Sequence, residues 1–232
     1  MAAEVTATEL LWGERTAPRR GPRPTLTLES IAAAGIGIAD AEGLAAVTMQ
    51  RVAERLGVTK MALYRYVPGK VELVALMTDL AVGGPPRLDE VGDGWRPRLD
   101  AWARRMFERF WAHPWAIEAT VGARAIGPNE LGWLEQAAAA LTGTGLTGSE
   151  ILDVAATLVG HVRTVAQQGA AISAGSPERA MNDAVVGLLA GREDRFPALV
   201  AALADRGGED QALDFGLRRI LDGVELLIDR RR

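Results

Sequence analysis

The stretch VAERLGVTKMALYRYVPGK, residues 52–70, decides the fold of this chain. It contains both tyrosines and both lysines of a sequence of 232 residues: Tyr64, Tyr66, Lys60 and Lys70. The remaining basic residues of the chain are all arginines, and they are spread along its whole length. Two rare residue types concentrated in one short stretch indicate that these four side chains share a role.

Local signals around this stretch predict two short helices joined by a tight turn. Thr48 can cap a helix over 49–56, Gly57 ends that helix, and Thr59 can cap a second helix over 60–66. A helix, a glycine turn and a second short helix in this order are typical of a helix-turn-helix. In that motif the second helix enters the DNA major groove with its first residues at the base edges.

The two faces of the second helix then have different roles. The residues that hold the crossing of the two helices are apolar: Val52, Leu56, Val58, Leu63 and Val67. The residues left facing outward are Lys60, Met61, Ala62, Tyr64 and Tyr66. On DNA a tyrosine hydroxyl can bond a phosphate, and Lys70 can hold a phosphate beside the N–H groups of the next helix. The alternative is that both tyrosines are packing residues of an unrelated helical domain.

The rest of the chain predicts an all-α protein, because strand-like alternation is absent from residue 26 onward. Helices are expected over 26–40, 69–82, 95–112, 114–123, 128–142, 147–173, 177–190 and 208–232. A Gly- and Pro-rich break over 83–94 separates a DNA-binding domain of residues 26–82 from a helical domain of residues 95–232. Residues 1–25 are expected to form an irregular, flexible basic arm.

Charge is distributed unevenly along the chain, whose net charge is −4. Residues 15–70 carry +5 and residues 71–232 carry −6, a pattern that indicates a polyanion-binding module on an acidic body. The absence of cysteine excludes disulfides and thiolate metal sites and fits a cytoplasmic protein. No apolar run reaches the roughly 18–20 residues that span a bilayer, and the N-terminus lacks the order of a secretory signal.

The segment GLAAVTMQRVAERLGVTKMALYRYVPGKVELVALM resembles the N-terminal domain of the tetracycline-repressor (TetR) family of bacterial transcription regulators. The similarity covers about residues 31–77 and includes VAERLGV, ALYRYV and Lys70 followed by VEL. It implies three DNA-binding helices, a connecting helix and an all-α C-terminal domain for ligand binding and dimerisation. The DNA contacts of the family map onto Thr48, Met49, Gln50, Lys60, Met61, Ala62, Tyr64, Tyr66 and Lys70. Met61 stands where the family often has a small residue, which leaves the operator sequence open.

The N-terminal arm carries four arginines within ERTAPRRGPRP: Arg15, Arg19, Arg20 and Arg23. One interpretation is an extension that enters the minor groove beside the recognition helix. The other is a solvated tail with no contact to DNA.

Candidate effector contacts lie in the tryptophan-rich region between residues 95 and 133 and on the long helix expected over 147–173. They are Trp102, Met106, Phe110, Trp115, Trp133, His161, Thr164 and Gln168. The apolar members either form only the core or also wall a ligand cavity. The polar groups of His161, Thr164 and Gln168, which share one helix face, find their hydrogen-bond partners either in other side chains or in a ligand.

The last helix carries a wide apolar stripe at heptad-like spacing: Leu213, Leu217, Ile220, Leu221, Val224, Leu227 and Ile228. Pairing this helix and the long helix before it with their copies would give a symmetric four-helix interface, and the family resemblance implies the same. Use of the stripe inside one protomer is the alternative.

These features predict a homodimeric, ligand-responsive DNA-binding regulator, a repressor that a small apolar or aromatic effector releases from its operator. The alternative is a helical module that binds a small molecule or a protein without operator binding. An enzyme is not expected, because the two histidines have no nucleophile-elbow serine or metal-ligand spacing near them. No cofactor and no metal are expected.

Overall fold

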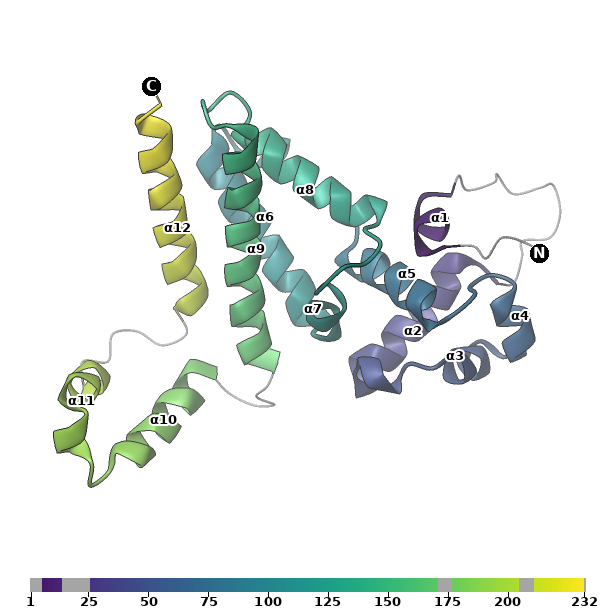
Figure 1. Ribbon diagram of the computed structural model, residues 1–232, viewed down its shortest axis with the longest axis horizontal. Helices are drawn as coiled ribbons and strands as arrows, with labels where there is room; N and C mark the ends of the chain where they lie inside the picture. Colours follow the sequence, from purple (N-terminus) through teal and green to yellow (C-terminus); the bar gives the residue numbers. More distant parts are fainter. Residues whose placement is uncertain (1–5, 14–25, 171–176, 205–210, 232) are drawn as a thin grey trace. The chain divides into compact units, whose positions relative to one another are not determined.

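The computed structural model describes residues 6–13, 26–170, 177–204 and 211–231, and every regular element in these ranges is helical (Figure 1). The predicted all-α fold is confirmed. Its contacts divide the chain into two compact units, residues 1–142 and residues 143–232. None of the described helices combines the length and apolar composition that crossing a membrane requires.

The first unit contains the helix-turn-helix. Helix α2 (Leu28–Glu42) is followed by the 3-10 turn η1 (Leu44–Ala46), by α3 (Met49–Leu56) and by α4 (Lys60–Tyr64). Gly57 ends α3 with φ of 67°, a left-handed conformation that glycine adopts without strain. Val52, Leu63 and Val67 are fully buried, as expected for the residues that hold the crossing of α3 and α4.

Helix α5 (Lys70–Val82) packs along α2 and connects the helix-turn-helix to the remaining helices of the unit (Figure 1). Gly35 explains how closely the two helices approach. A Cβ atom at this position would lie 2.6 Å from the Sδ atom of Met77 on α5. The glycine within α2 therefore costs some helix propensity and allows tight packing in return.

The first unit continues with the 3-10 turn η2 (Asp89–Val91), α6 (Trp95–Ala112), α7 (Trp115–Ala119) and α8 (Pro128–Leu141). Helices α6 and α8 share a core that contains Trp102 and Trp133. Helix α7 is shorter than expected. The chain turns after it, and Gly122, with φ of 85°, belongs to that turn.

One short helix lies where an irregular arm was expected. Helix α1 (Ala7–Trp12) begins with a capping box in which Thr6 and Glu9 satisfy each other's backbone N–H groups. It packs on α5, and the Trp12 indole donates a hydrogen bond of 2.8 Å to the backbone carbonyl of Ile126. The expectation of irregular structure is therefore wrong for these residues, because tertiary contacts hold a helix too short to be stable alone.

The second unit consists of α9 (Gly148–Ala170), α10 (Pro177–Leu189), the 3-10 turn η3 (Glu193–Arg195), α11 (Pro197–Ala204) and α12 (Ala212–Asp229). Helices α9 and α12 run side by side and antiparallel, with Arg231 paired to Glu150 at one end (Figure 1). Their shared core includes Leu158, Val162, Leu217 and Ile228, all at most 1% exposed. Helix α11 was not expected from the sequence.

Candidate nucleic-acid interface

The central group of side chains predicted to meet DNA stands on the surface of α4 and of the turn that follows it. Thr59 caps this helix of five residues, and its hydroxyl accepts a hydrogen bond of 3.2 Å from the Ala62 N–H. Met61 is 74% exposed, and Tyr64 and Tyr66 are 38% and 37% exposed. Large apolar and aromatic side chains at such exposure form a surface patch that suits a partner molecule.

Lys60 and Tyr64 also interact with each other. The Lys60 ammonium lies 5.7 Å from the centroid of the Tyr64 ring, within the range of a cation–π contact. Because they occupy the first and last positions of α4, the contact extends along the exposed side of the helix. A cation and a phenol are thus presented together on one face.

The start of α3 contributes three further predicted contacts. The hydroxyl of Thr48 caps α3 by accepting from the Arg51 N–H at 3.2 Å, and Gln50 donates to Glu54 at 2.7 Å. Met49 is only 7% exposed and packs inside the domain, so a DNA contact from this residue would be limited to its backbone N–H. Arg51 pairs with Glu42 of α2 and fixes the start of α3.

The start of α5 adds Lys70, which is exposed at the first position of the helix. Gly69 precedes it, and no side chain caps the helix there. The first backbone N–H groups of α5 are therefore available to an anion such as a phosphate. Arg19, Arg20 and Arg23, the arginines expected to enter the minor groove, lie outside the described residues.

Comparison with known proteins assigns both parts of the chain. Residues 31–77 match the family described as "Bacterial regulatory proteins, tetR family", and residues 86–228 match the family described as "Tetracyclin repressor-like, C-terminal domain". The second match alone covers more than half of the chain. The chain belongs to the TetR family. It is therefore a ligand-responsive, DNA-binding transcriptional regulator, and the family membership expected from the resemblance is confirmed.

Two relatives and one solved structure illustrate the similarity. The HTH-type transcriptional repressor DrrR1 of Streptomyces coeruleorubidus is 37% identical, over 97% of this chain and 86% of its own. An HTH-type transcriptional regulator of Saccharopolyspora erythraea is 28% identical, over 87% of this chain and 86% of its own. Apo ActR of Streptomyces coelicolor has the same fold, with a TM-score of 0.76 at 23% identity, over 91% of this chain and all of its own. TetR regulators bind operators and small-molecule effectors and are typically dimers.

The predicted apolar effector contacts of this TetR chain lie in the core of the first unit. Trp102, Met106, Phe110 and Trp133 are all less than 9% exposed, and the rings of Trp102 and Trp133 meet edge to face at 6.0 Å. The Trp102 indole donates to the Trp133 carbonyl at 2.8 Å, and the Trp133 indole donates to the Gly83 carbonyl at 3.0 Å. These satisfied donors favour the packing interpretation for both tryptophans.

Trp115 connects the DNA-binding helices to the body. Its indole donates a hydrogen bond of 2.7 Å to Asp40 Oδ1 on α2, and His113 Nδ1 lies 2.8 Å from the same oxygen. The Asp40 carboxylate belongs to the DNA-binding domain, and the two rings belong to the α6–α7 junction. A residue predicted to touch effector is thus placed where a change in the body could reach α2.

The predicted polar contacts lie on α9 in the second unit. His161 Nε2 lies 3.1 Å from the Leu213 carbonyl of α12, and Thr164 donates to the Gly160 carbonyl of its own helix at 3.0 Å. Gln168 is exposed. His161 therefore contacts α12 from α9. This agrees with the alternative in which its polar group is satisfied within the protein and not by a ligand.

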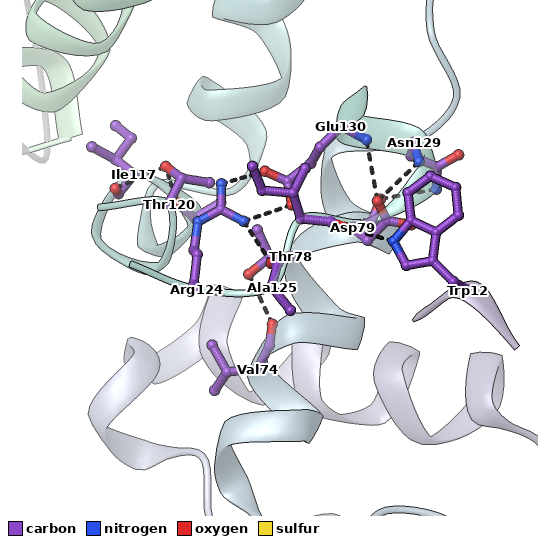
Figure 2. A network of polar contacts seen from close by, with 12 residues as sticks. Trp12, Val74, Thr78, Asp79, Ile117, Thr120, Arg124, Ala125, Asn129 and Glu130 are labelled. Atoms are coloured by element: carbon purple, nitrogen blue, oxygen red, sulfur yellow. Dashed lines mark hydrogen bonds and ion pairs between the residues drawn. The ribbon is translucent and has the colours of Figure 1, made fainter. Parts of the chain in front are cut away.

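Asp79 joins two helices of the first unit, and the sequence did not point it out. It lies on α5, is 7% exposed, and its Oδ1 atom accepts from the N–H groups of Asn129 and Glu130 at 3.0 and 3.1 Å (Figure 2). Burial raises the pKa of Asp79 above its ordinary value, although these hydrogen bonds oppose the shift. Asp79 thus caps α8 from another helix, a long-range contact that no local motif announces.

Proposed function

We propose that this regulator is a homodimeric repressor that binds a two-fold symmetric operator through α4 and is released by a small apolar or aromatic effector. The observation that carries the proposal is the exposed face of α4 and of the turn after it, where Lys60, Met61, Tyr64 and Tyr66 stand outward from a buried scaffold. Such a face would gain little by remaining in water. In a major groove it offers a cation, a phenol and an apolar contact to base edges.

Operator binding would use α4 for base edges and the flanking elements for phosphates. Lys70 and the N-terminus of α5 suit a phosphate on one side of the groove, and Thr48 and Gln50 suit the backbone on the other. Two protomers would place two copies of α4 in successive major grooves, about 34–36 Å apart. DrrR1 is a repressor, which supports repression as the outcome here.

Dimerisation would use the outer faces of α9 and α12. The inner stripe of α12, including Leu217 and Ile228, already packs on α9, so part of the predicted stripe serves the protomer core. The outer faces still carry large exposed apolar residues: Leu152, Phe215 and Leu226, each more than half exposed. Small residues between them allow close helix approach, as in a four-helix interface.

The effector would act in the helical body and reach α2 through the α6–α7 junction. ActR, a protein of the same fold, is known in complex with actinorhodin and with (S)-DNPA, which supports a small-molecule effector for this chain. Asp40 receives both His113 and Trp115, so a shift of the junction would change how α2 is held. The effector can move the equilibrium only by its difference in affinity for the two forms, typically about 1–3 kcal/mol.

Selection and binding experiments test this function. Duplexes enriched on the wild-type protein from a random-sequence pool should contain an inverted repeat, and their affinity should fall steeply with salt. Lys60→Ala and Lys70→Ala should each weaken binding and reduce the salt slope by about one. Arg105→Ala is the matched control, because Arg105 is an exposed cation on α6, away from α3 and α4. Failure to enrich any sequence, with all three variants equal to wild type, would favour a binding module without an operator.

A further inference from the structure

A hollow lies between the N-terminal helix α1 and the connecting helix α5. It measures about 680 Å³, and its walls come from α1, α2, α5 and the start of α8. Leu10, Leu28, Leu76 and Leu80 supply apolar surface, and Trp12 lies at its edge. A volume of this size is in the range of sites that hold drug-sized molecules. The effector candidates of α6 and α9 do not line it.

The charged residues in the described lining of the hollow are all acidic. Glu9, Glu29 and Asp79 border it, and its described lining contains no Lys, Arg or His. The described residues also contain no group of three His, Asp or Glu side chains placed to hold a metal ion. An apolar hollow whose described lining carries carboxylates and no cationic side chain favours an organic cation over an anion.

Asp79 provides the point of attachment. Both of the backbone hydrogen bonds to its carboxylate converge on Oδ1, so no backbone N–H of the described residues donates to Oδ2. Within the described part of the chain no cationic side chain pairs with Asp79, and the nearby Arg124 is engaged by Glu130 (Figure 2). A buried carboxylate without a cation is costly, so a ligand that brings one gains that interaction.

We propose that this hollow, walled by α1, α2, α5 and α8, is a binding site for a small amphipathic organic amine whose ammonium group pairs with Asp79. The apolar body of the amine lies against Leu28, Leu76 and Leu80, and Trp12 covers its outer side. The site exists within one protomer and does not rest on operator binding. Because α2 packs on α3 of the helix-turn-helix and α8 belongs to the body, an occupant touches both parts of the unit.

Three probes with the same ring and different charge test the proposal without DNA. They are 1-naphthylmethylamine, the neutral 1-naphthalenemethanol and the anionic 1-naphthoate. Calorimetry should show the amine binding about tenfold or more tightly than the alcohol, because it adds a charge-assisted contact, and should show no binding of the naphthoate. In nitrogen-15 NMR spectra the amine should shift the Trp12 indole N–H signal, which Trp12→Phe identifies.

Two variants make the test specific. Asp79→Asn should reduce amine binding to the level of the alcohol. Leu80→Lys places a cation at the hollow and should block the amine even if Asp79→Asn fails to fold. Leu134→Lys is its matched control, because Leu134 of α8 is equally exposed, 38%, and lies outside the hollow. Equal affinity for all three probes, or amine binding that neither Asp79→Asn nor Leu80→Lys changes, would overturn the proposal.

Discussion

Asp79 uses its carboxylate to hold the start of α8, although it belongs to α5. Gly127 makes this possible, because a Cβ atom there would lie 2.1 Å from Asp79 Oδ1. The Asn129 amide completes the contact by donating to the Asp79 main-chain carbonyl at 3.0 Å. One residue thus joins the connecting helix to the body through three hydrogen bonds.

The raised pKa of Asp79 predicts how stability depends on pH. Burial favours the protonated carboxyl in the folded state, and the negative charge of Glu130 adds to this. The folded state has its full stability while the Asp79 carboxyl is protonated, below the unfolded pKa of about 3.9. It loses this contribution as the pH rises through the folded pKa. The free energy of unfolding of the wild type should therefore fall, relative to that of Asp79→Asn, as the pH rises from about 4 through the raised pKa of the folded state. Urea unfolding of both proteins across this range measures the difference. A wild type that gains stability relative to Asp79→Asn as the pH rises would contradict the account.

Gly216 of α12 is required for the position of His161. A Cβ atom at residue 216 would lie 2.1 Å from His161 Cε1, where the ring crosses to the Leu213 carbonyl. Gly216→Ala should therefore lower the free energy of unfolding by about 1–3 kcal/mol, even though alanine favours helix. The control is Gly187→Ala in α10, where a Cβ atom meets no neighbour, and it should be neutral or stabilising by up to about 1 kcal/mol. Equal effects in denaturant unfolding would show that His161 does not need this space.

At the scale of single elements, α4 depends on its cap. It has five residues, so the hydrogen bond from the Ala62 N–H to Thr59 is a large part of what holds its first turn. Thr59→Ala should cost about 1 kcal/mol, or about fivefold in operator affinity, because the helix must be ordered to bind. Thr59→Ser keeps the hydroxyl and should bind like the wild type. Anisotropy titrations with the selected operator give both values, and an unchanged Thr59→Ala protein would show that DNA alone orders α4.

The sequence predicted elements well where the signals were local. The ranges 49–56 and 95–112 are confirmed, because a cap or a glycine marks their ends. Helix α1 was missed although Thr6 and Glu9 form a capping box, since its stability comes from α5 and from the bond between Trp12 and Ile126. Helix α11 begins with Pro197, but its almost wholly apolar sequence has no polar face to reveal a helical period.

The candidate site was predicted to a similar extent. The outward position of Tyr64 and Tyr66 followed from the helix-turn-helix spacing, whereas burial of Met49 depends on the packing of α3 against other helices. The role of Asp79 could not be predicted, because its partners lie about fifty residues away along the chain. Long-range contacts of this kind leave no local pattern.

At the scale of the whole molecule, the proposed dimer can be tested on its outer helix faces. Gly223 is exposed on α12, near Phe215 and Leu226 along the outer face, and a Cβ atom there meets nothing in the protomer. Gly223→Arg should therefore leave the protomer folded but convert the dimer to a monomer, because a charge would be buried between the two copies. Sedimentation velocity measures the mass, and Ala139→Arg on the exposed side of α8 is the control. A Gly223→Arg protein that remains dimeric would place the interface elsewhere.

Protection of Met61 by operator DNA tests the central claim most directly. Hydroxyl-radical oxidation followed by mass spectrometry reports the solvent access of Met61, which is 74% exposed, and of Met181, which is 62% exposed on α10. If α4 enters the major groove, saturating operator should slow oxidation of Met61 and Tyr64 several-fold and leave Met181 unchanged. Oxidation of Met61 at the same rate with and without bound operator would contradict the assignment of α4 as the recognition helix.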